Sequence, residues 1–336
     1  MNGIYTLAND YVYDQLVALL NSIEVNVGSE VPVVVIAYDD SVERVSEEID
    51  KRENVSLLND PEIFAPWENF SLEAWKGHPY ALQLWSQKGI TGVNRIGMNR
   101  RYCAFDPRAP FDKFMYFDAD VLVLNNVDYI FNQLSHSDFV VYDFQYKDPS
   151  HIYDINSPKL YEIFPEIRVQ KEIFCAGFYA GRRGLFTLEE RAWLVDQLNN
   201  DEGEILYWSA PNQSLLNYMK MRLQIPVYNF ALELPLDVRT GCSVTSPHFE
   251  ERDHLLYDKG CQLTYLHYIG VPSSAFRRIC QGENIGFPYR DIFMHYRYLR
   301  EPESCPTLKG RVIDYQSKSV SLQDRILKKL GLSKRS

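Results

Sequence analysis

Two acidic residues, Asp118 and Asp120, are separated by one alanine in the segment FMYFDADVLVLNN. Apolar runs on both sides place the pair at the carboxyl end of a predicted buried strand. Residues i and i+2 of an extended chain point to the same side, so both carboxylates can face one cation. Such oxygen ligands suit Mg²⁺ or Mn²⁺ bridging to a diphosphate. The segment therefore predicts a divalent metal site, although D-x-D alone is common and often only caps a turn.

Phosphatases that use an aspartate nucleophile also place D-x-D after a strand. In those enzymes Gly or Thr usually follows the motif, which lies near the N-terminus. Here Val121 and Leu122 follow, more than a hundred residues into the chain. The sequence therefore does not favour a phosphatase of this type.

The elements that must position these carboxylates alternate between strand and helix patterns. Apolar runs predict strands at 4–8, 31–37, 55–58, 113–117, 121–124, 139–142, 174–180 and 263–267. Helical patterns occur at 12–23, 41–51, 95–105, 187–199 and 211–221. Residues 60–94 are rich in aromatic and loop-forming residues, including Trp67, Trp75 and Trp85. The alternation predicts an α/β fold with a mainly parallel sheet, whose strand ends form ligand sites.

Composition limits the classes of function. The chain has 336 residues, of which 46% are hydrophobic, enough for a large core. Its net charge of -10 argues against a general nucleic-acid-binding protein. Binding an anionic phosphate ligand would therefore need a cation or a few well-placed arginines. We expect one domain over residues 1–308 and a basic tail over 309–336.

Other signals bear on location. The six cysteines form no C-x-x-C pair, which favours reduced thiols and a cytoplasmic protein. The N-terminal residues do not resemble a signal peptide, and no apolar run is long enough to span a membrane. Basic and apolar residues near 320–330 fit an amphipathic helix on an anionic membrane. A disordered or oligomer-contacting tail fits them equally well.

Several short motifs, in order over residues 1 to about 280, resemble glycosyltransferase family 8. This group includes glycogenin and the bacterial lipopolysaccharide galactosyltransferases. The resemblance implies a GT-A fold, a single Rossmann-like mixed sheet flanked by helices, with D-x-D at a strand end. The segment IYTLANDYVYDQL resembles the family's first strand and nucleotide-binding turn. It places these residues near the base and ribose: Thr6, Ala8, Asn9, Asp10 and Tyr11.

The D-x-D segment matches the family over 114–124 and adds Ala119 to the implied donor-binding residues. An arginine usually precedes the first Asp by seventeen residues and helps hold the donor. That position is Arg101 here, with Arg100 beside it. The segment FCAGFYAG resembles the family's F-N-A-G strand, with Cys175 replacing the Asn. The backbone of Ala176 and Gly177 can still approach a ligand closely.

Two motifs of the second half complete the resemblance. NQSLLN resembles the family's D-Q-D-x-L-N helix start, so Asn212 and Gln213 face the donor, while Asn212 and Ser214 replace acids. LTYLHYIG resembles the H-x-x-G strand end, which makes His267 the implied third metal ligand and Gly270 part of the following turn. The family's subsequent lysine is replaced by Ser273, so the diphosphate would be neutralised by Arg277 or Arg278.

The resemblance implies a metal-dependent, retaining glycosyltransferase. It would transfer a hexose from a UDP-sugar, with Mn²⁺ or Mg²⁺, to a glycan or lipid-linked acceptor that the sequence does not identify. The metal and Arg101 would stabilise the leaving diphosphate, and Gln213 would lie near the anomeric carbon. Asp143, after another apolar strand, is a candidate for holding sugar hydroxyls and fits a structural role nearly as well.

Two alternatives stay open. A sugar-1-phosphate nucleotidyltransferase is also α/β and metal-dependent, but it normally has a Gly-rich basic loop after the first strand. The segment TLANDYVYDQL has neither feature. A catalytically silent nucleotide-sugar-binding protein is the second alternative, supported by the substitutions at Cys175, Asn212 and Ser214.

Overall fold

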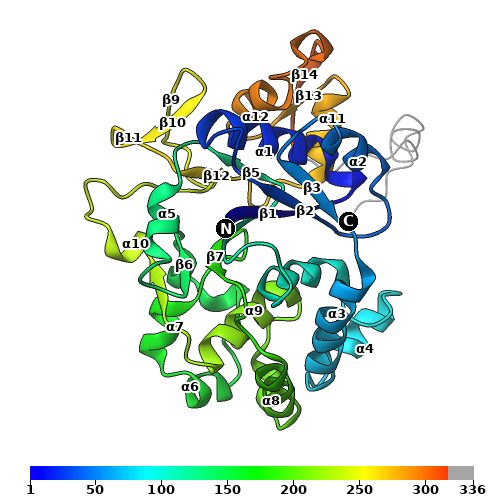
Figure 1. Ribbon diagram of the computed structural model, residues 1–336, viewed down its shortest axis with the longest axis vertical. Coiled ribbons are helices and arrows are strands. Elements are labelled where there is room, and N and C mark those ends of the chain that lie inside the picture. The colour runs from blue at the N-terminus through cyan, green and yellow to red at the C-terminus, as the bar shows by residue number, and fades with distance from the viewer. Residues whose placement is uncertain (317–336) are drawn as a thin grey trace, which may run out of the picture.

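A seven-stranded mixed sheet forms the centre of the computed structural model, which describes residues 1–316 (Figure 1). Its strand order is β3-β2-β1-β4-β7-β6-β8. The strands are β1 (Asn2–Ala8), β2 (Val33–Ala37), β3 (Val55–Leu58), β4 (Lys113–Phe117), β6 (Phe139–Val141), β7 (Phe178–Arg182) and β8 (Val227–Asn229). Strands β1 to β4 are parallel, whereas β7 runs antiparallel to both of its neighbours. The mixed sheet predicted from the sequence is confirmed.

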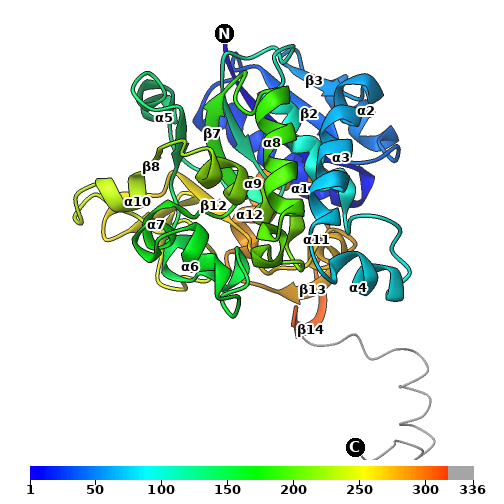
Figure 2. The same ribbon diagram turned by 90° about the horizontal axis from the view of Figure 1, so that it is seen from below.

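Helices cover both faces of this sheet. On one side lie α1 (Tyr13–Asn26), α2 (Glu43–Ile49), α11 (Ser273–Cys280) and α12 (Arg290–Arg297). On the other lie α3 (Pro61–Lys76), α8 (Leu188–Asn199) and α9 (Pro211–Arg222), which stand in front of the sheet in Figure 2. Every residue of β2 is buried, as a strand between two helical layers requires.

A small sheet next to the centre positions the D-x-D segment. Strand β5 (Val121–Val123) follows directly after Asp120 and pairs antiparallel with β12 (Tyr265–His267). Their register places His267 opposite Val121. Two segments about 145 residues apart in the chain therefore meet at the end of β4.

The aromatic stretch at 60–94 forms two helices, α3 and α4 (Ala81–Gln87). Asp60 caps α3 by accepting a hydrogen bond from the amide of Glu62, and Pro61 occupies its first turn. The tryptophans of these helices are fully buried: Trp67, Trp75 and Trp85. The internal Pro66 interrupts the helical pattern in the sequence, but burial of the large rings stabilises the helices nevertheless.

Two other elements differ from expectation. Residues 96–105 form a 3-10 helix, η2 (Ile96–Phe105), in place of an α-helix. The strand expected at 174–180 begins only at Phe178. Amides of 174–176 donate to side chains, not to a neighbouring strand, so this segment cannot extend the sheet. The pairs are Phe174 with Asn217, Cys175 with Asp143, and Ala176 with Gln213.

The remaining elements are short. They are α5 (Asp128–Gln133), α6 (Lys159–Ile163), α7 (Glu166–Glu172), α10 (Phe230–Glu233), β9 (Glu250–Arg252), β10 (Leu255–Asp258) and β11 (Cys261–Gln262), and 3-10 turns η1 (Asp10–Val12), η3 (Gln145–Lys147), η4 (Pro149–His151), η5 (Glu202–Ile205) and η6 (Pro302–Ser304). The expected tail begins with a strand, because β14 (Lys309–Asp314) pairs with β13 (Glu283–Gly286). The predicted amphipathic helix near 320–330 lies outside the described residues. Across residues 1–316, no helix has the length and apolarity needed to cross a bilayer.

Candidate functional site

The three predicted metal ligands come together. One ligand atom each from Asp118, Asp120 and His267 lies within 4.8 Å of the others. The intervening turn is held on both sides, because the amide of Asp118 donates to Gly177 at 2.9 Å and Tyr268 donates to the carbonyl of Asp120 at 2.9 Å. Two carboxylates and one imidazole form a donor set that fits Mn²⁺ or Mg²⁺. We call these three residues the acidic–histidine cluster.

Arg101 holds Asp118 from the protein interior. Its side chain is fully buried and donates to a carboxylate oxygen of Asp118 at 2.8 Å. The Tyr116 hydroxyl donates to the same oxygen at 2.9 Å. Burial favours a lower pKa for the Arg101 guanidinium, but the charge of Asp118 raises that pKa above its usual value. Arg101 therefore orients Asp118, a predicted metal ligand, and keeps its own positive charge.

Arg100 points elsewhere. It donates to Glu68 at 2.6 Å and to the carbonyl of Ala37 at 3.0 Å, and its guanidinium lies over the ring of Phe64. These contacts tie η2 to α3 and β2. The structure thus separates the two arginines that the sequence placed together.

His267 carries the opposite charge to Asp120. One ring nitrogen, Nε2, lies 3.5 Å from Asp120, and Nδ1 lies 3.9 Å from the sulfur of Cys175. Burial alone would lower the pKa of His267, but the charge of Asp120 raises it well above the usual value. Reciprocally, burial tends to raise the pKa of Asp120, and His267 holds that pKa below its usual range. A protonated His267 thus partly neutralises the cluster.

Gly177 makes room for this imidazole. A Cβ atom at position 177 would lie 2.2 Å from Cε1 of His267 and 2.7 Å from Nδ1. No side chain larger than hydrogen can occupy this position while the ring stays in place. The sequence predicted that the Ala176–Gly177 backbone would approach a ligand; the close approach that the structure contains is to His267.

Two clefts border the cluster. The first cleft, of about 450 Å³, reaches Asp118 and Asp120; the second, of about 740 Å³, reaches His267. The first is lined by Leu7, Ala8, Asn9, Tyr11, Val12, Gln15, Tyr38, Arg95, Met98, Asp118, Ala119, Asp120 and Ser273. The second is lined by residues 143–148, His151, Cys175, Phe178, Leu236, residues 239–243, Thr245, Ser246, His248, Asp258, Lys259, Tyr265, His267 and Ile269. The acidic–histidine cluster therefore stands where the two clefts approach each other.

The first cleft contains part of the predicted donor-binding turn. Ala8, Asn9 and Tyr11 line it, and the guanidinium of Arg277 lies 4.5 Å from the ring centre of Tyr11. Asn9 is fixed by donating to Asp39 at 2.8 Å. This wall offers an aromatic ring, an amide and a nearby cation to a ligand.

Thr6, Asp10 and Gly270 are among the predicted donor-binding residues that do not line this cleft. Thr6 is fully buried in β1, and its hydroxyl has no partner within residues 1–316. Asp10 instead accepts a hydrogen bond from the amide of Val45 in α2. Gly270 lies in the turn after β12 with φ of +82°, in space where a Cβ would meet no neighbour.

The sequence missed other lining residues of the first cleft: Gln15, Tyr38, Arg95, Met98 and Ser273. Gln15 interrupts the apolar face of α1, and Arg95 has a left-handed backbone with φ of +56° at the start of η2. A polar residue on an otherwise buried helix face is the one signal that could have indicated Gln15 in advance.

Gln213 and Asn212 support the backbone beside the cluster. The Gln213 side-chain oxygen accepts from the amide of Ala176 at 2.9 Å, and its nitrogen donates to the carbonyl of His151 at 3.2 Å. The carbonyl of Asn212 accepts from Tyr102 at 2.5 Å. Neither residue lines the first or the second cleft.

Asp143 lies on the wall of the second cleft. Its carboxylate accepts from the amides of Gln145 at 2.7 Å and Cys175 at 3.1 Å. The residue is only 5% exposed, and burial raises the pKa of its carboxyl to about 7. Asp143 can therefore act as a hydrogen-bond acceptor or as a proton carrier near neutral pH.

Comparison with known proteins places the fold. No protein-family model and no curated protein matches the chain. The apo structure of the bifunctional glycosyltransferase WbbM superposes with a TM-score of 0.51 at 12% identity. That match covers 90% of this chain and 51% of WbbM. The chain has the GT-A glycosyltransferase fold, as the sequence predicted.

Two other solved structures are similar. Mouse xyloside xylosyltransferase 1 in its apo form has a TM-score of 0.48 at 9% identity, covering 68% of this chain and 85% of that one. The galactosyltransferase LgtC, in complex with donor and acceptor sugar analogs, has a TM-score of 0.47 at 16% identity. It covers 80% of this chain and 87% of its own.

Metal binding should release a proton from His267. The charge of Asp120 raises the pKa of His267 and so favours the protonated imidazole, whereas coordination requires the neutral form. Calorimetric titration of Mn²⁺ in two buffers of different ionisation enthalpy should show release of up to about one proton. His267→Asn should bind Mn²⁺ more weakly and release none. A wild-type heat that is identical in both buffers would contradict the proposed exchange of a proton for a cation.

Gly177→Ala should displace His267 and weaken Mn²⁺ binding at least about tenfold, since the new methyl group overlaps the ring. Thermal unfolding and titration of Mn²⁺ measure the two consequences separately. The double variant Gly177→Ala/His267→Ala is the matched control, because it removes the overlap. It should regain thermal stability relative to Gly177→Ala without regaining metal affinity. If the double variant is no more stable than Gly177→Ala, the overlap between the new methyl group and the His267 ring is not the cause of the loss.

Proposed function

We propose that this protein is a metal-dependent glycosyltransferase that takes a UDP-sugar in the first cleft and a hydroxyl acceptor in the second. The observation that carries the proposal is the position of the acidic–histidine cluster between these clefts. A donor diphosphate and an acceptor hydroxyl must meet at one point, and this is the point that both clefts reach. The GT-A fold supports the same assignment.

Several residues in and beside the first cleft have roles in this proposal. The ring of Tyr11 and the amide of Asn9 would bind the base and ribose, with the Arg277 guanidinium behind the ring. A bound Mn²⁺ or Mg²⁺ would neutralise the diphosphate and assist its departure. Asp118, Asp120 and His267 would hold that ion, and Arg101 would keep Asp118 oriented through their 2.8 Å contact.

We further propose transfer with retention of configuration, as the family 8 resemblance implies. The first turn of α9, Pro211 to Ser214, contains no carboxylate that could attack the sugar. Gln213 is a neutral amide there and is bonded to Ala176. In this mechanism the leaving phosphate accepts the proton of the acceptor hydroxyl. Asp143, on the second cleft, would hold the sugar hydroxyls.

The alternative of a silent nucleotide-sugar-binding protein rests on three substitutions. Cys175 contacts His267, and Ser214 accepts from the amide of Tyr207 at 2.9 Å. Asn212 accepts a hydrogen bond through its carbonyl. These contacts are compatible with an active site or a binding site. Turnover of UDP-glucose, UDP-galactose or UDP-N-acetylglucosamine with Mn²⁺ distinguishes an enzyme from a binding protein, and nucleotide transfer to a sugar phosphate would identify the nucleotidyltransferase.

UDP should bind tightly only with a divalent cation, since the diphosphate must otherwise approach Asp118 and Asp120 directly. Calorimetry with Mn²⁺ and with excess chelator measures the difference, which we expect to exceed about tenfold in affinity. Asp120→Asn should remove most of the Mn²⁺ dependence. Equal affinity for UDP with Mn²⁺ and with chelator in the unmodified protein would refute the metal-bridged donor.

The configuration of the product tests retention. With an α-linked UDP-sugar, the first-formed product should contain an α linkage, read from its anomeric proton coupling by NMR before any anomerisation. Because Gln213 holds the Ala176 amide, Gln213→Ala should lower turnover while UDP affinity stays close to that of the parent. A β-linked product would overturn the retaining mechanism without affecting the proposed donor site.

A further inference from the structure

The second cleft contains both cationic and acidic side chains, on a protein whose net charge is -10. Three permanently charged cations line it: Lys147, Arg239 and Lys259. In residues 1–316, none of the three has a carboxylate within ion-pair distance. The metal and donor chemistry of the neighbouring cleft does not use these groups. They need another explanation.

Lys147 and Arg239 are held by contacts that leave their charge uncompensated. The ammonium of Lys147 lies 4.7 Å from the ring centre of Phe144, which orients it without neutralising it. Arg239 donates to the carbonyls of Leu232 and Leu234 at 2.5–3.1 Å. Carbonyl oxygens accept these bonds but carry no net charge, so the guanidinium still attracts an anion.

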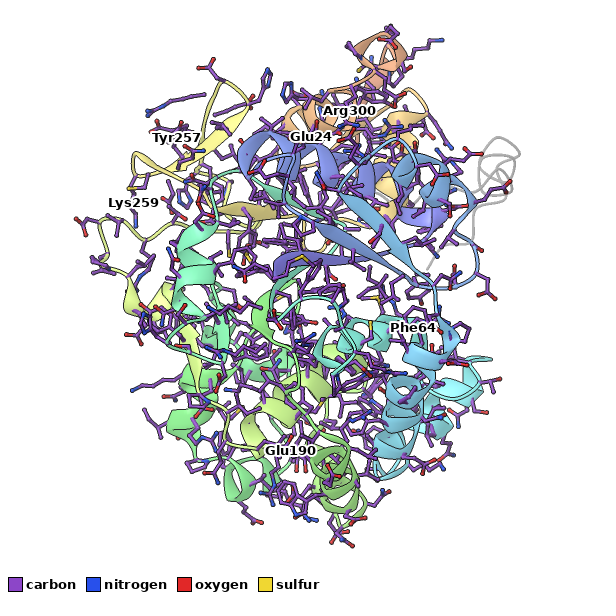
Figure 3. All side chains as sticks on the ribbon, in the orientation of Figure 1. Glu24, Phe64, Glu190, Tyr257, Lys259 and Arg300 are labelled. Carbon is purple, nitrogen blue, oxygen red and sulfur yellow. The ribbon has the colours of Figure 1, made fainter. Side chains whose placement is uncertain are left out.

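Lys259 occupies an unfavourable backbone position. It lies with Gly260 in the two-residue turn between β10 and β11, where φ is +51° and +85°. Such turns strongly favour Asn or Asp before the Gly, because other side chains are strained at positive φ. Figure 3 labels Lys259 on this turn, near Tyr257. A long cation placed there at a conformational cost suggests a function for its charge.

The carboxylates of the cleft do not cancel these cations directly. Asp143 and Asp258 are each about 5% exposed, and both accept hydrogen bonds from backbone amides; Asp148 is exposed and has its own partners. Their donors are Gln145 and Cys175 for Asp143, Gly241 and His248 for Asp258, and Ser150 and His151 for Asp148. The acids therefore have local hydrogen-bond partners, whereas within residues 1–316 Lys147, Arg239 and Lys259 have no carboxylate partner.

Apolar side chains stand beside the cations. Leu236 is 75% exposed and Ile269 is 38% exposed, and both line the second cleft. Val238, next to Arg239, is 46% exposed. Exposed apolar residues are ordinary when scattered, but Leu236 and Ile269 line the same cleft as the three cations. The combination suits a ligand with a charged group and a hydrocarbon part.

We propose that the second cleft selects an acceptor that carries a phosphate group, which Lys147, Arg239 and Lys259 bind while the sugar hydroxyl faces His267. This inference rests on the proposed role of the second cleft as the acceptor site. Two sources share the chemistry: a lipid-linked saccharide phosphate and a free sugar phosphate. The apolar residues Leu236 and Ile269 favour the lipid-linked source.

Equilibrium binding tests the proposal without requiring turnover. The probes are octyl phosphate, glucose 6-phosphate and the neutral octyl glucoside, titrated into the full chain with excess chelator so that no metal attracts phosphate to the first cleft. Both phosphates should bind, with affinities that fall as salt is raised, and octyl glucoside should bind at least about tenfold more weakly than octyl phosphate. Tighter binding of octyl phosphate indicates the lipid-linked source; tighter binding of glucose 6-phosphate indicates the free one.

The variant Lys147→Gln/Lys259→Asn should weaken phosphate binding about tenfold or more. Asn suits the left-handed turn position, and Gln retains part of the side chain over Phe144, so the fold should persist. The matched control is Lys88→Gln, because Lys88 is an exposed lysine over the ring of Trp208 outside both clefts. It should bind phosphate like the parent protein.

Three binding results would overturn the proposed phosphate site. Octyl glucoside binding as tightly as octyl phosphate, or unchanged phosphate binding by Lys147→Gln/Lys259→Asn, would overturn it. Loss of affinity in Lys88→Gln as well would overturn it too, since the effect would not be specific to the cleft. Failure of the glycosyltransferase assignment is measured separately, by absence of UDP-sugar turnover with Mn²⁺ under any acceptor, and does not alter these binding results.

Discussion

Repulsion between Asp118 and Asp120 is the constraint on which the site depends. Like charges about 5 Å apart repel by about 3 kcal/mol at an effective dielectric constant of about 20. The protein compensates each carboxylate from a different direction: buried Arg101 contacts Asp118, and His267 lies against Asp120. Both compensating groups come from distant segments. The 3-10 helix η2 and the β5–β12 pairing therefore exist at this place for an electrostatic reason as well as a packing reason.

The backbone before β7 makes room for His267, the residue that compensates the charge of Asp120. His267 needs space that only a glycine at 177 leaves open. The preceding amides then turn away from the sheet and donate to Asn217, Asp143 and Gln213. Side chains thus replace a strand partner over these residues, and they fix the backbone more specifically than a sheet edge would. The residues beside the acidic–histidine cluster are therefore supported by side chains of α9 and of the segment after β6.

The sequence predicted the parts of this arrangement that follow from periodicity. Buried strands such as β2, the D-x-D turn and the strand carrying His267 were all evident from apolar runs and their ends. The helix α3 was not, because Pro66 and the clustered tryptophans obscure its period. The seventeen-residue spacing indicated Arg101, and the structure brings that residue to Asp118; the contacts of Arg100 with Glu68 and Ala37 depend on the 3-10 geometry of η2, which has no clear sequence signal.

The walls of the two clefts are built differently, and for this reason the sequence predicted much of the first wall and little of the second. The first is formed largely at the ends of β1 and β4, so the sheet determines its shape and the strand pattern reveals it. The second is formed by irregular segments around 143–151, 236–248 and 258–260. Their conformation depends on contacts between distant residues, such as the 2.8 Å bond from Gly241 to Asp258.

Loops held in this way can change side chains without disturbing the sheet. The wall of the first cleft is therefore constrained by the sheet, whereas the wall of the second is free to vary in charge and polarity. Lys259, at a turn position that favours Asn, belongs to this variable part: the framework does not require its cationic side chain, so its charge is available for the phosphate group that we propose.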